Sequence, residues 1–103
     1  MHALTRRAYA LENQFAHDQE LLFKAEARRN RLIGLWVAAV TNKADPESYA
    51  DDIKSFGIAH PDQVFERLRQ DFETAGVTVL DDELRHRMAT MLKEIADDLY
   101  RGG

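Results

Sequence analysis

Hydrophobic residues recur at helical spacing along most of the chain, and no stretch shows the strict alternation that a half-buried strand would have. After residue 44, three apolar stripes repeat every three or four residues. They comprise Tyr49, Ile53 and Phe56; Phe65, Leu68, Phe72 and Ala75; and Leu84, Met88, Met91, Ile95 and Leu99. Each stripe predicts a helix with one buried face.

Residues that favour helix ends lie between these stripes. The expected helix starts are Asp45-Pro46, His60-Pro61 and Asp81, which we expect to be the N-cap of the last helix. Gly57 and Gly76 are expected to follow helix ends as C′ residues. Short loops therefore separate the predicted helices.

The segment before these stripes predicts a helix that is hydrophobic on several sides over residues 23–40. We expect it to be the central helix. Gly34 lowers its intrinsic stability by about 1 kcal/mol relative to alanine, which indicates that another helix approaches closely there. The sequence thus predicts an all-α protein, with residues 15–103 forming an antiparallel four-helix bundle.

Residues 1–14 differ from this body. Leu4, Ala8, Leu11 and Phe15 form a thin apolar stripe with charged neighbours, and no residue caps the start of a helix. Isolated helices shorter than about 12 to 15 residues are marginal in water. We therefore predict a flexible, mobile N-terminal arm that becomes ordered against a partner.

Charge is unevenly distributed along the chain. Residues 1–43 hold seven Lys/Arg against four Asp/Glu (+3), whereas residues 44–103 hold seven against fourteen (−7). The acidic remainder would repel nucleic acid, so a protein partner is favoured. The longest apolar run, Leu32 to Val40, is shorter than the roughly 20 residues of a membrane-spanning helix. We expect a cytoplasmic protein without membrane insertion.

The sequence offers little for catalysis or metal binding. It has no cysteine, and His2, His17, His60 and His86 lack the three- or four-residue spacing of a ligand pair. Adjacent carboxylates such as Asp97-Asp98 point about 100° apart on a helix and do not converge as an acid and a base must. We expect no enzyme activity and no metal site.

Basic residues cluster at Lys24, Arg28, Arg29 and Arg31. This cluster is interpreted as a solvated helix face or as a contact for a protein or a nucleotide phosphate. Nucleic acid is disfavoured because no aromatic residue alternates with the arginines to stack on bases.

Several segments together resemble one family. They are Phe15-Ala16-His17-Asp18, Glu20-Leu21, the continuous run from Phe23 to Trp36, Tyr49-Ala50, Asp62 to Phe65, Arg69, Asp71, Ala75-Gly76-Val77 and Met88. The chain resembles the DUF1476 family, the zeta subunit that inhibits bacterial F-type ATP synthase. The resemblance covers nearly the whole chain.

This resemblance implies a four-helix bundle preceded by an inhibitory segment. That segment would insert between the catalytic α and β subunits of the F1 sector, near the rotor γ subunit, and arrest ATP hydrolysis. The residues that match it by position are Leu4, Arg6, Arg7, Ala8, Leu11, Glu12, Phe15 and His17. The protein would then be peripheral on the F1 sector and monomeric when free.

Two other functions stay open at this stage. One is a small adenine-nucleotide sensor in which Lys24, Arg28, Arg29 and Arg31 bind the phosphates of ATP or ADP weakly. The other is a general helical adaptor with weak or no ATPase inhibition. No other cofactor is expected.

Overall fold

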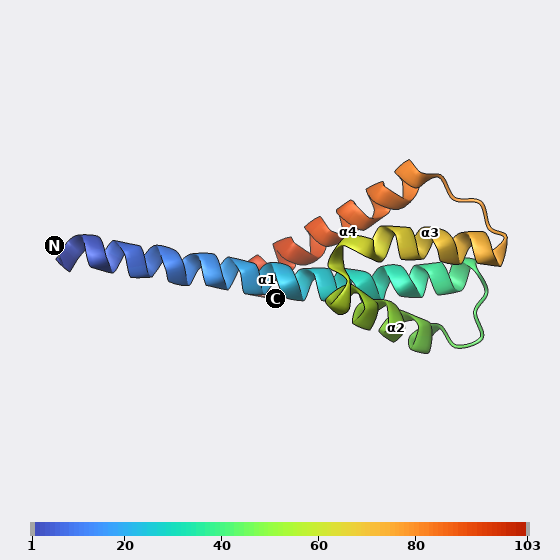
Figure 1. The fold of residues 1–103 in the computed structure, drawn as a ribbon, viewed down its shortest axis with the longest axis horizontal. Helices are drawn as coiled ribbons and strands as arrows, with labels where there is room; N and C mark the ends of the chain where they lie inside the picture. Colours follow the sequence, from blue (N-terminus) through green and yellow to red (C-terminus); the bar gives the residue numbers. More distant parts are fainter. Residues whose placement is uncertain (1, 103) are drawn as a thin grey trace.

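The computed structural model describes the backbone of residues 2–102 and the side chains of residues 16–102, and all regular structure in this part of the chain is helical. The elements in chain order are α1 (His2–Val40), α2 (Pro46–Ala59), the 3-10 turn η1 (Pro61–Gln63), α3 (Val64–Ala75) and α4 (Asp81–Tyr100) (Figure 1). The predicted all-α class is confirmed.

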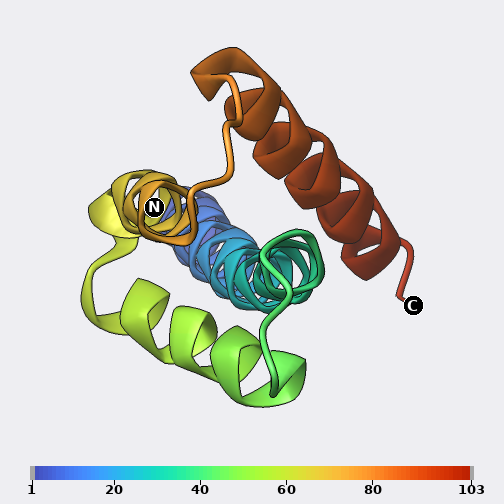
Figure 2. The same ribbon diagram turned by 90° about the vertical axis from the view of Figure 1, so that its right-hand side faces the viewer.

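The long helix α1 sets the shape of the molecule, which measures 63 × 23 × 22 Å. α2 runs back along the C-terminal half of α1, α3 reverses direction again, and α4 returns at a tilt (Figure 1). Viewed along its axis, α1 lies among the other three helices (Figure 2), as predicted for the central helix. In a regular four-helix bundle each helix packs against its neighbours around a common core. Here α2 and α4 pack chiefly against α1, so the regular bundle stays a prediction.

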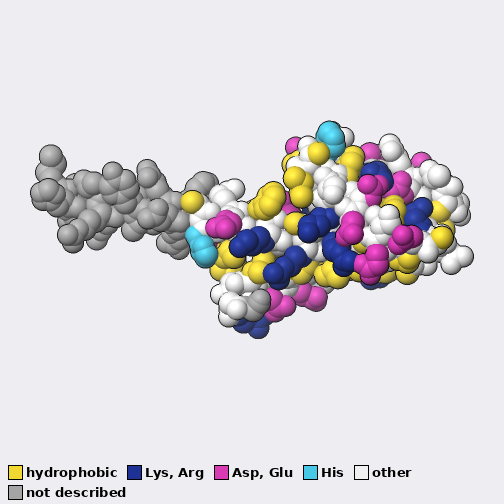
Figure 3. Space-filling view, turned by 90° about the horizontal axis from the view of Figure 1, so that it is seen from below, with side chains coloured by type: hydrophobic (Ala, Val, Ile, Leu, Met, Phe, Trp, Pro, Cys, Tyr) yellow, Lys and Arg dark blue, Asp and Glu magenta, His cyan; other side chains and the backbone are white. Residues whose placement is uncertain are grey.

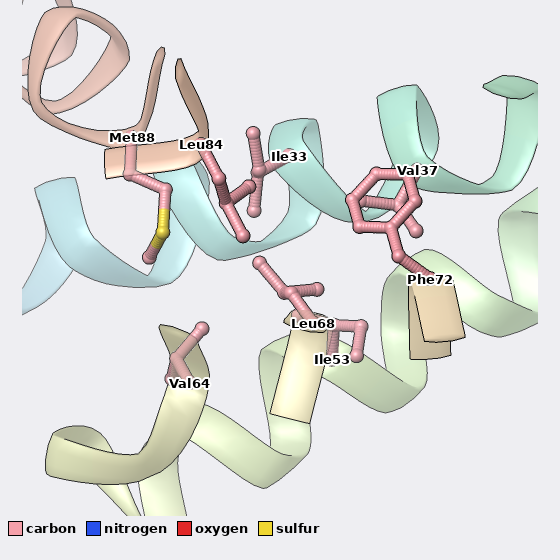
Figure 4. Packing of buried hydrophobic residues seen from close by; sticks show 8 residues of the cluster. All are labelled: Ile33, Val37, Ile53, Val64, Leu68, Phe72, Leu84 and Met88. Carbon is pink, nitrogen blue, oxygen red and sulfur yellow. The ribbon is translucent and has the colours of Figure 1, made fainter. Parts of the chain in front are cut away.

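One hydrophobic cluster joins the four helices. It consists of Ile33 and Val37 from α1, Ile53 from α2, Val64, Leu68 and Phe72 from α3, and Leu84 and Met88 from α4 (Figure 4). Trp36 packs its ring edge against Phe72, with ring centroids 5.7 Å apart. Burial of such side chains contributes about 1.5 to 3 kcal/mol each. Most residues of the predicted stripes thus form the core or pack against it, but Ala75 at the end of α3 is exposed, and Ile95 and Leu99 on α4 are half-buried outside the cluster.

The predictions for two glycines in the α1–α2 interface have different outcomes. At Gly34 a Cβ atom would lie 2.9 Å from the Cα of Ala50, so the predicted close approach of another helix is confirmed. The prediction that Gly57 follows a helix end is wrong, because Gly57 is buried inside α2, against the side-chain amide of Asn30. α2 continues to Ala59 because Pro61, which is unsuited to a helix interior, comes only later.

Two of the predicted helix ends are confirmed. The Asp45 carboxylate accepts a hydrogen bond of 3.1 Å from the backbone N–H of Ser48 and caps α2. Gly76 ends α3 in the left-handed conformation, with φ 71°. The N–H of Val77 then donates to the carbonyl of Phe72 at 3.0 Å, as in a glycine-terminated helix.

The other two starts differ from expectation. Asp81 is not an N-cap: it is the first residue of α4, and Leu80 occupies the capping position without a side-chain hydrogen bond. The Asp81 carboxylate instead lies 3.2 Å from Nε of Arg69 on α3. At the His60-Pro61 start the chain first forms the turn Pro61–Gln63, and the α-helix begins at Val64.

Candidate protein-binding surface

The arm predicted over residues 1–14 coincides with the N-terminal end of α1, whose backbone continues from His2 without a break (Figure 1). His17 is a predicted contact residue with a described side chain, and it is exposed. The other predicted contacts have side chains outside the described residues: Leu4, Arg6, Arg7, Ala8, Leu11, Glu12 and Phe15. Mobility of the arm and its contacts stay predictions.

A hydrogen bond joins the end of α4 to α1 just after the arm. The Tyr100 hydroxyl donates to Oδ1 of Asp18 at 3.1 Å. This hydrogen bond raises the pKa of Tyr100, because the carboxylate stabilises the protonated phenol. The C-terminal end of α4 therefore reaches α1 as far as Asp18.

Only part of the basic cluster predicted on α1 comes together: Arg28 and Arg31 line one hollow, and Lys24 and Arg29 do not. The Lys24 ammonium lies 3.6 Å from Glu20, and Arg31 forms ion pairs with Glu47 and with Asp51, the latter at 3.2 Å. Both cations therefore have carboxylate partners that would compete with a phosphate.

The other two arginines of the cluster differ from each other. Arg29 is half-buried and donates from Nε to Oδ1 of Asn30 at 2.7 Å. Burial lowers the pKa of Arg29, and the nearby charge of Glu26 acts in the opposite direction. Arg28 is exposed. Arg29 is thus partly enclosed by the folded body, whereas Arg28 faces the surface.

A surface with both apolar and basic side chains lies where α1 meets α2. We call it the α1–α2 seam, defined by Phe23, Ala27, Arg28, Leu32, Lys54 and Ile58. It contains two hollows of about 230 Å³ and about 140 Å³, which share Ala27. Phe23, Ile58 and Leu32 are 56%, 53% and 45% exposed. On the face shown in Figure 3, Lys and Arg side chains lie among hydrophobic ones.

Sequence reasoning did not identify Lys54 and Ile58. Both lie on α2, and the stripe of that helix predicted only which face is buried. No sequence signal connects them with Phe23 or Leu32, because their proximity depends on how α2 packs against α1.

A polar network fixes α2 against α3. The Tyr49 hydroxyl donates to Oδ2 of Asp71 at 2.6 Å, and Nε of Arg67 donates to the same oxygen at 3.0 Å. Arg67 also reaches Asp52 at 3.3 Å. Burial raises the pKa of Tyr49, and the hydrogen bond to Asp71 raises it further. The network orients α2 and therefore the seam.

Two kinds of feature were sought in the described part of the chain: a metal-ion site and a membrane-spanning helix. Among those residues, no three His, Asp or Glu side chains form a group that could hold a metal ion. No helix among them is long and apolar enough to cross a membrane. The predicted arm and the α1–α2 seam are candidates for binding another protein.

Comparison with known proteins identifies the family of the chain. A search of curated proteins finds no match to the chain. A family model described as ATPase inhibitor subunit zeta matches residues 1–98, which include the predicted arm, α1 to α3 and all but the last two residues of α4. The chain therefore belongs to the ATPase inhibitor subunit zeta family.

Proposed function

We propose that this protein inhibits ATP hydrolysis by the F-type ATP synthase of its source organism. Its N-terminal segment enters the catalytic interface between the α and β subunits, next to the rotor γ subunit, while the helical body stays outside. The observation that carries this proposal is the family match, which begins at residue 1 and so includes the predicted arm. The protein itself catalyses no reaction in this proposal.

The continuity of α1 supports a mechanism in which the body nucleates the helix of the arm. Starting an isolated helix is unfavourable by a factor of about 10⁻³, whereas extending an existing helix is not. Residues 25–38 of α1 already pack in the body. The arm therefore needs only to extend α1 when the partner surface covers its apolar stripe, and the entropy cost of ordering is smaller.

The direct test is deletion of residues 1–14. We expect the full-length protein to inhibit ATP hydrolysis by the isolated F1 sector, and the truncated protein to lose this inhibition at the same concentration. Equal inhibition by both proteins would contradict the proposal, as would full activity of the F1 sector with saturating full-length protein.

A point substitution tests the apolar stripe without shortening the chain. Leu11→Asp places a charge within the stripe, and Gln14→Asp adds the same charge outside it. Because a buried charge without a partner costs several kcal/mol, Leu11→Asp should weaken inhibition far more than Gln14→Asp. Similar loss in both variants would show that net charge matters and the stripe does not.

Adenine-nucleotide binding, the alternative function, has less support. Lys24 and Arg31 already have carboxylate partners, and Arg29 is engaged with Asn30. Titration with ATP, followed by amide chemical shifts, tests this alternative. A saturable response at residues 24–31 would favour it over the inhibitor proposal only if ATP hydrolysis by the F1 sector is unaffected.

A further inference from the structure

We propose that the α1–α2 seam is a second docking surface, which binds an acidic amphipathic helix on the outside of the same ATP synthase. This inference rests on the proposed function and adds a contact made by the helical body. The arm would supply inhibition, and the seam would supply much of the affinity.

The apolar part of the seam suits a protein partner. Phe23, Ile58 and Leu32 expose about half of their surfaces, and they border two adjoining hollows. Covering exposed apolar surface stabilises a complex by about 25 cal/mol per Å² before the costs of association. An amphipathic helix places apolar side chains at intervals of three and four residues, which suits a row of hollows along a groove between two helices.

The charges around the seam indicate an acidic partner. Among the described residues, no carboxylate lies within ion-pair distance of Arg28 or Lys54, whereas Lys24 and Arg31 have partners. Glu26 lines the smaller hollow, and Arg31 in the larger one is already paired with Glu47 and Asp51, so the positive charge offered to a partner is that of Arg28 and Lys54. Complementary charge raises the association rate and orients the partner, and its effect weakens with salt.

The position of the seam on α1 allows both surfaces to act together. At about 1.5 Å per residue, Phe23 lies only about 14 Å along the helix from residue 14, where the predicted arm ends. One helix thus links the two contacts. Binding at one contact would raise the effective concentration of the other, and such linkage strengthens binding by about 10²-fold or more.

The test is charge reversal in the full-length protein. Arg28→Glu with Lys54→Glu should raise the Kd for the isolated F1 sector by about tenfold or more and reduce its dependence on salt. Maximal inhibition at saturating protein should stay unchanged, because the arm is intact. The matched control is Lys93→Glu with Arg101→Glu, which changes net charge equally at exposed positions on α4 and just after it.

An apolar pair of variants tests the same surface independently of charge. Ile58→Ser should weaken binding, whereas Leu80→Ser, at a residue 69% exposed in the α3–α4 connection, should not. Thermal denaturation of each variant confirms that the fold is retained, as expected at exposed positions.

The outcomes separate this inference from the proposed function. An unchanged Kd and salt dependence in the seam variants would overturn the second docking surface while leaving inhibition by the arm intact. A second contrary result is that the wild-type protein binds vesicles of anionic lipid and that charge reversal abolishes this binding without changing the Kd for the F1 sector. The seam would then bind lipid, and the second docking surface for the synthase would be overturned. Wild-type protein that binds the F1 sector without inhibiting it would overturn the proposed function, and the seam would then be judged by Kd alone.

Discussion

Two parts of α1 carry similar apolar residues but have different surroundings. Within residues 25–38, six residues are buried: Ala25, Asn30, Ile33, Gly34, Val37 and Ala38. In residues 16–24 every side chain is exposed or half-buried, even though Leu21, Leu22 and Phe23 are as hydrophobic as those of the core. The burial of a helix face therefore depends on which elements pack against it as well as on its own pattern.

The surroundings of α1 explain this difference. Residues 25–38 lie against α2 and the core cluster, where Gly34 and Gly57 allow close contact. Near residue 18, by contrast, the end of α4 makes contact through the exposed bond between Tyr100 and Asp18. Local stability should thus decrease along α1 towards its N-terminus, and such a gradient suits a helix that is fixed at one end and binds a partner at the other.

The largest effect is expected at Ile33, which is fully buried beside Leu32, which is 45% exposed. Ile33→Ala removes core contacts and leaves a cavity, and should lower the free energy of unfolding by about 2 to 5 kcal/mol. Leu32→Ala is the matched control on the same helix and should lower it by less than about 1 kcal/mol. Urea denaturation measures both. Equal losses would show that the two faces of α1 are not distinguished by packing.

A smaller effect is expected where Gly57 meets Asn30. In Gly57→Ala the new methyl group would overlap the Asn30 amide, which is only 4% exposed. We expect a net loss of about 1 to 3 kcal/mol, because overpacking outweighs the better helix propensity of alanine. Asn30→Ala creates space for the new methyl group. The double variant Asn30→Ala with Gly57→Ala should therefore lose less stability than the sum of the losses in the two single variants. Simple additivity in urea denaturation would contradict this contact.

The sequence predicted most of this interface but not its register. The apolar stripes identified Ile53 and Leu68 as core residues, and Gly34 indicated the close approach of a helix. Gly57 was assigned to a helix end, because a glycine after an apolar stripe fits a C′ position equally well. Only the packing of α2 on Asn30 shows that its missing side chain serves the α1–α2 interface.

The candidate binding surface was predicted only in part. The basic residues of α1 were evident from the sequence, but the ion pairs of Arg31 with Glu47 and Asp51 join positions 16 and 20 residues apart. Likewise, Lys54 and Ile58 border the seam only because α2 packs antiparallel to α1. Such pairings depend on tertiary structure, for which a single sequence provides no periodic signal.

The network between α2 and α3 gives the next prediction. Tyr49→Phe removes the hydrogen bond to Asp71 and should lower the free energy of unfolding by about 1.5 kcal/mol at neutral pH, as for bonds to charged groups. Asp71 keeps its bond to Arg67, which limits the loss. The measurement is urea denaturation at pH 7, with the exposed Tyr100→Phe as the control.

The same variant predicts a pH dependence. Because folding raises the pKa of Tyr49, the protonated phenol is favoured in the folded state. Its stabilising contribution is complete below the ordinary tyrosine pKa of about 10 and is lost as the pH rises above that value. The stability difference between the wild-type protein and Tyr49→Phe should therefore shrink between pH 9 and pH 11. A difference that is constant with pH would contradict the bond.

The smallest effect is expected at the N-terminal edge of the described contacts, where Tyr100 donates to Asp18. Because both side chains are near solvent, Tyr100→Phe should leave the denaturation midpoint unchanged. Amides in the last turn of α4 should exchange with solvent faster, while amides near Ile33 keep wild-type protection. Asp18→Asn keeps an acceptor and should have a weaker effect. Uniformly faster exchange along α1 would show that stability does not decrease towards its N-terminus, and the two parts of α1 would then behave as one unit.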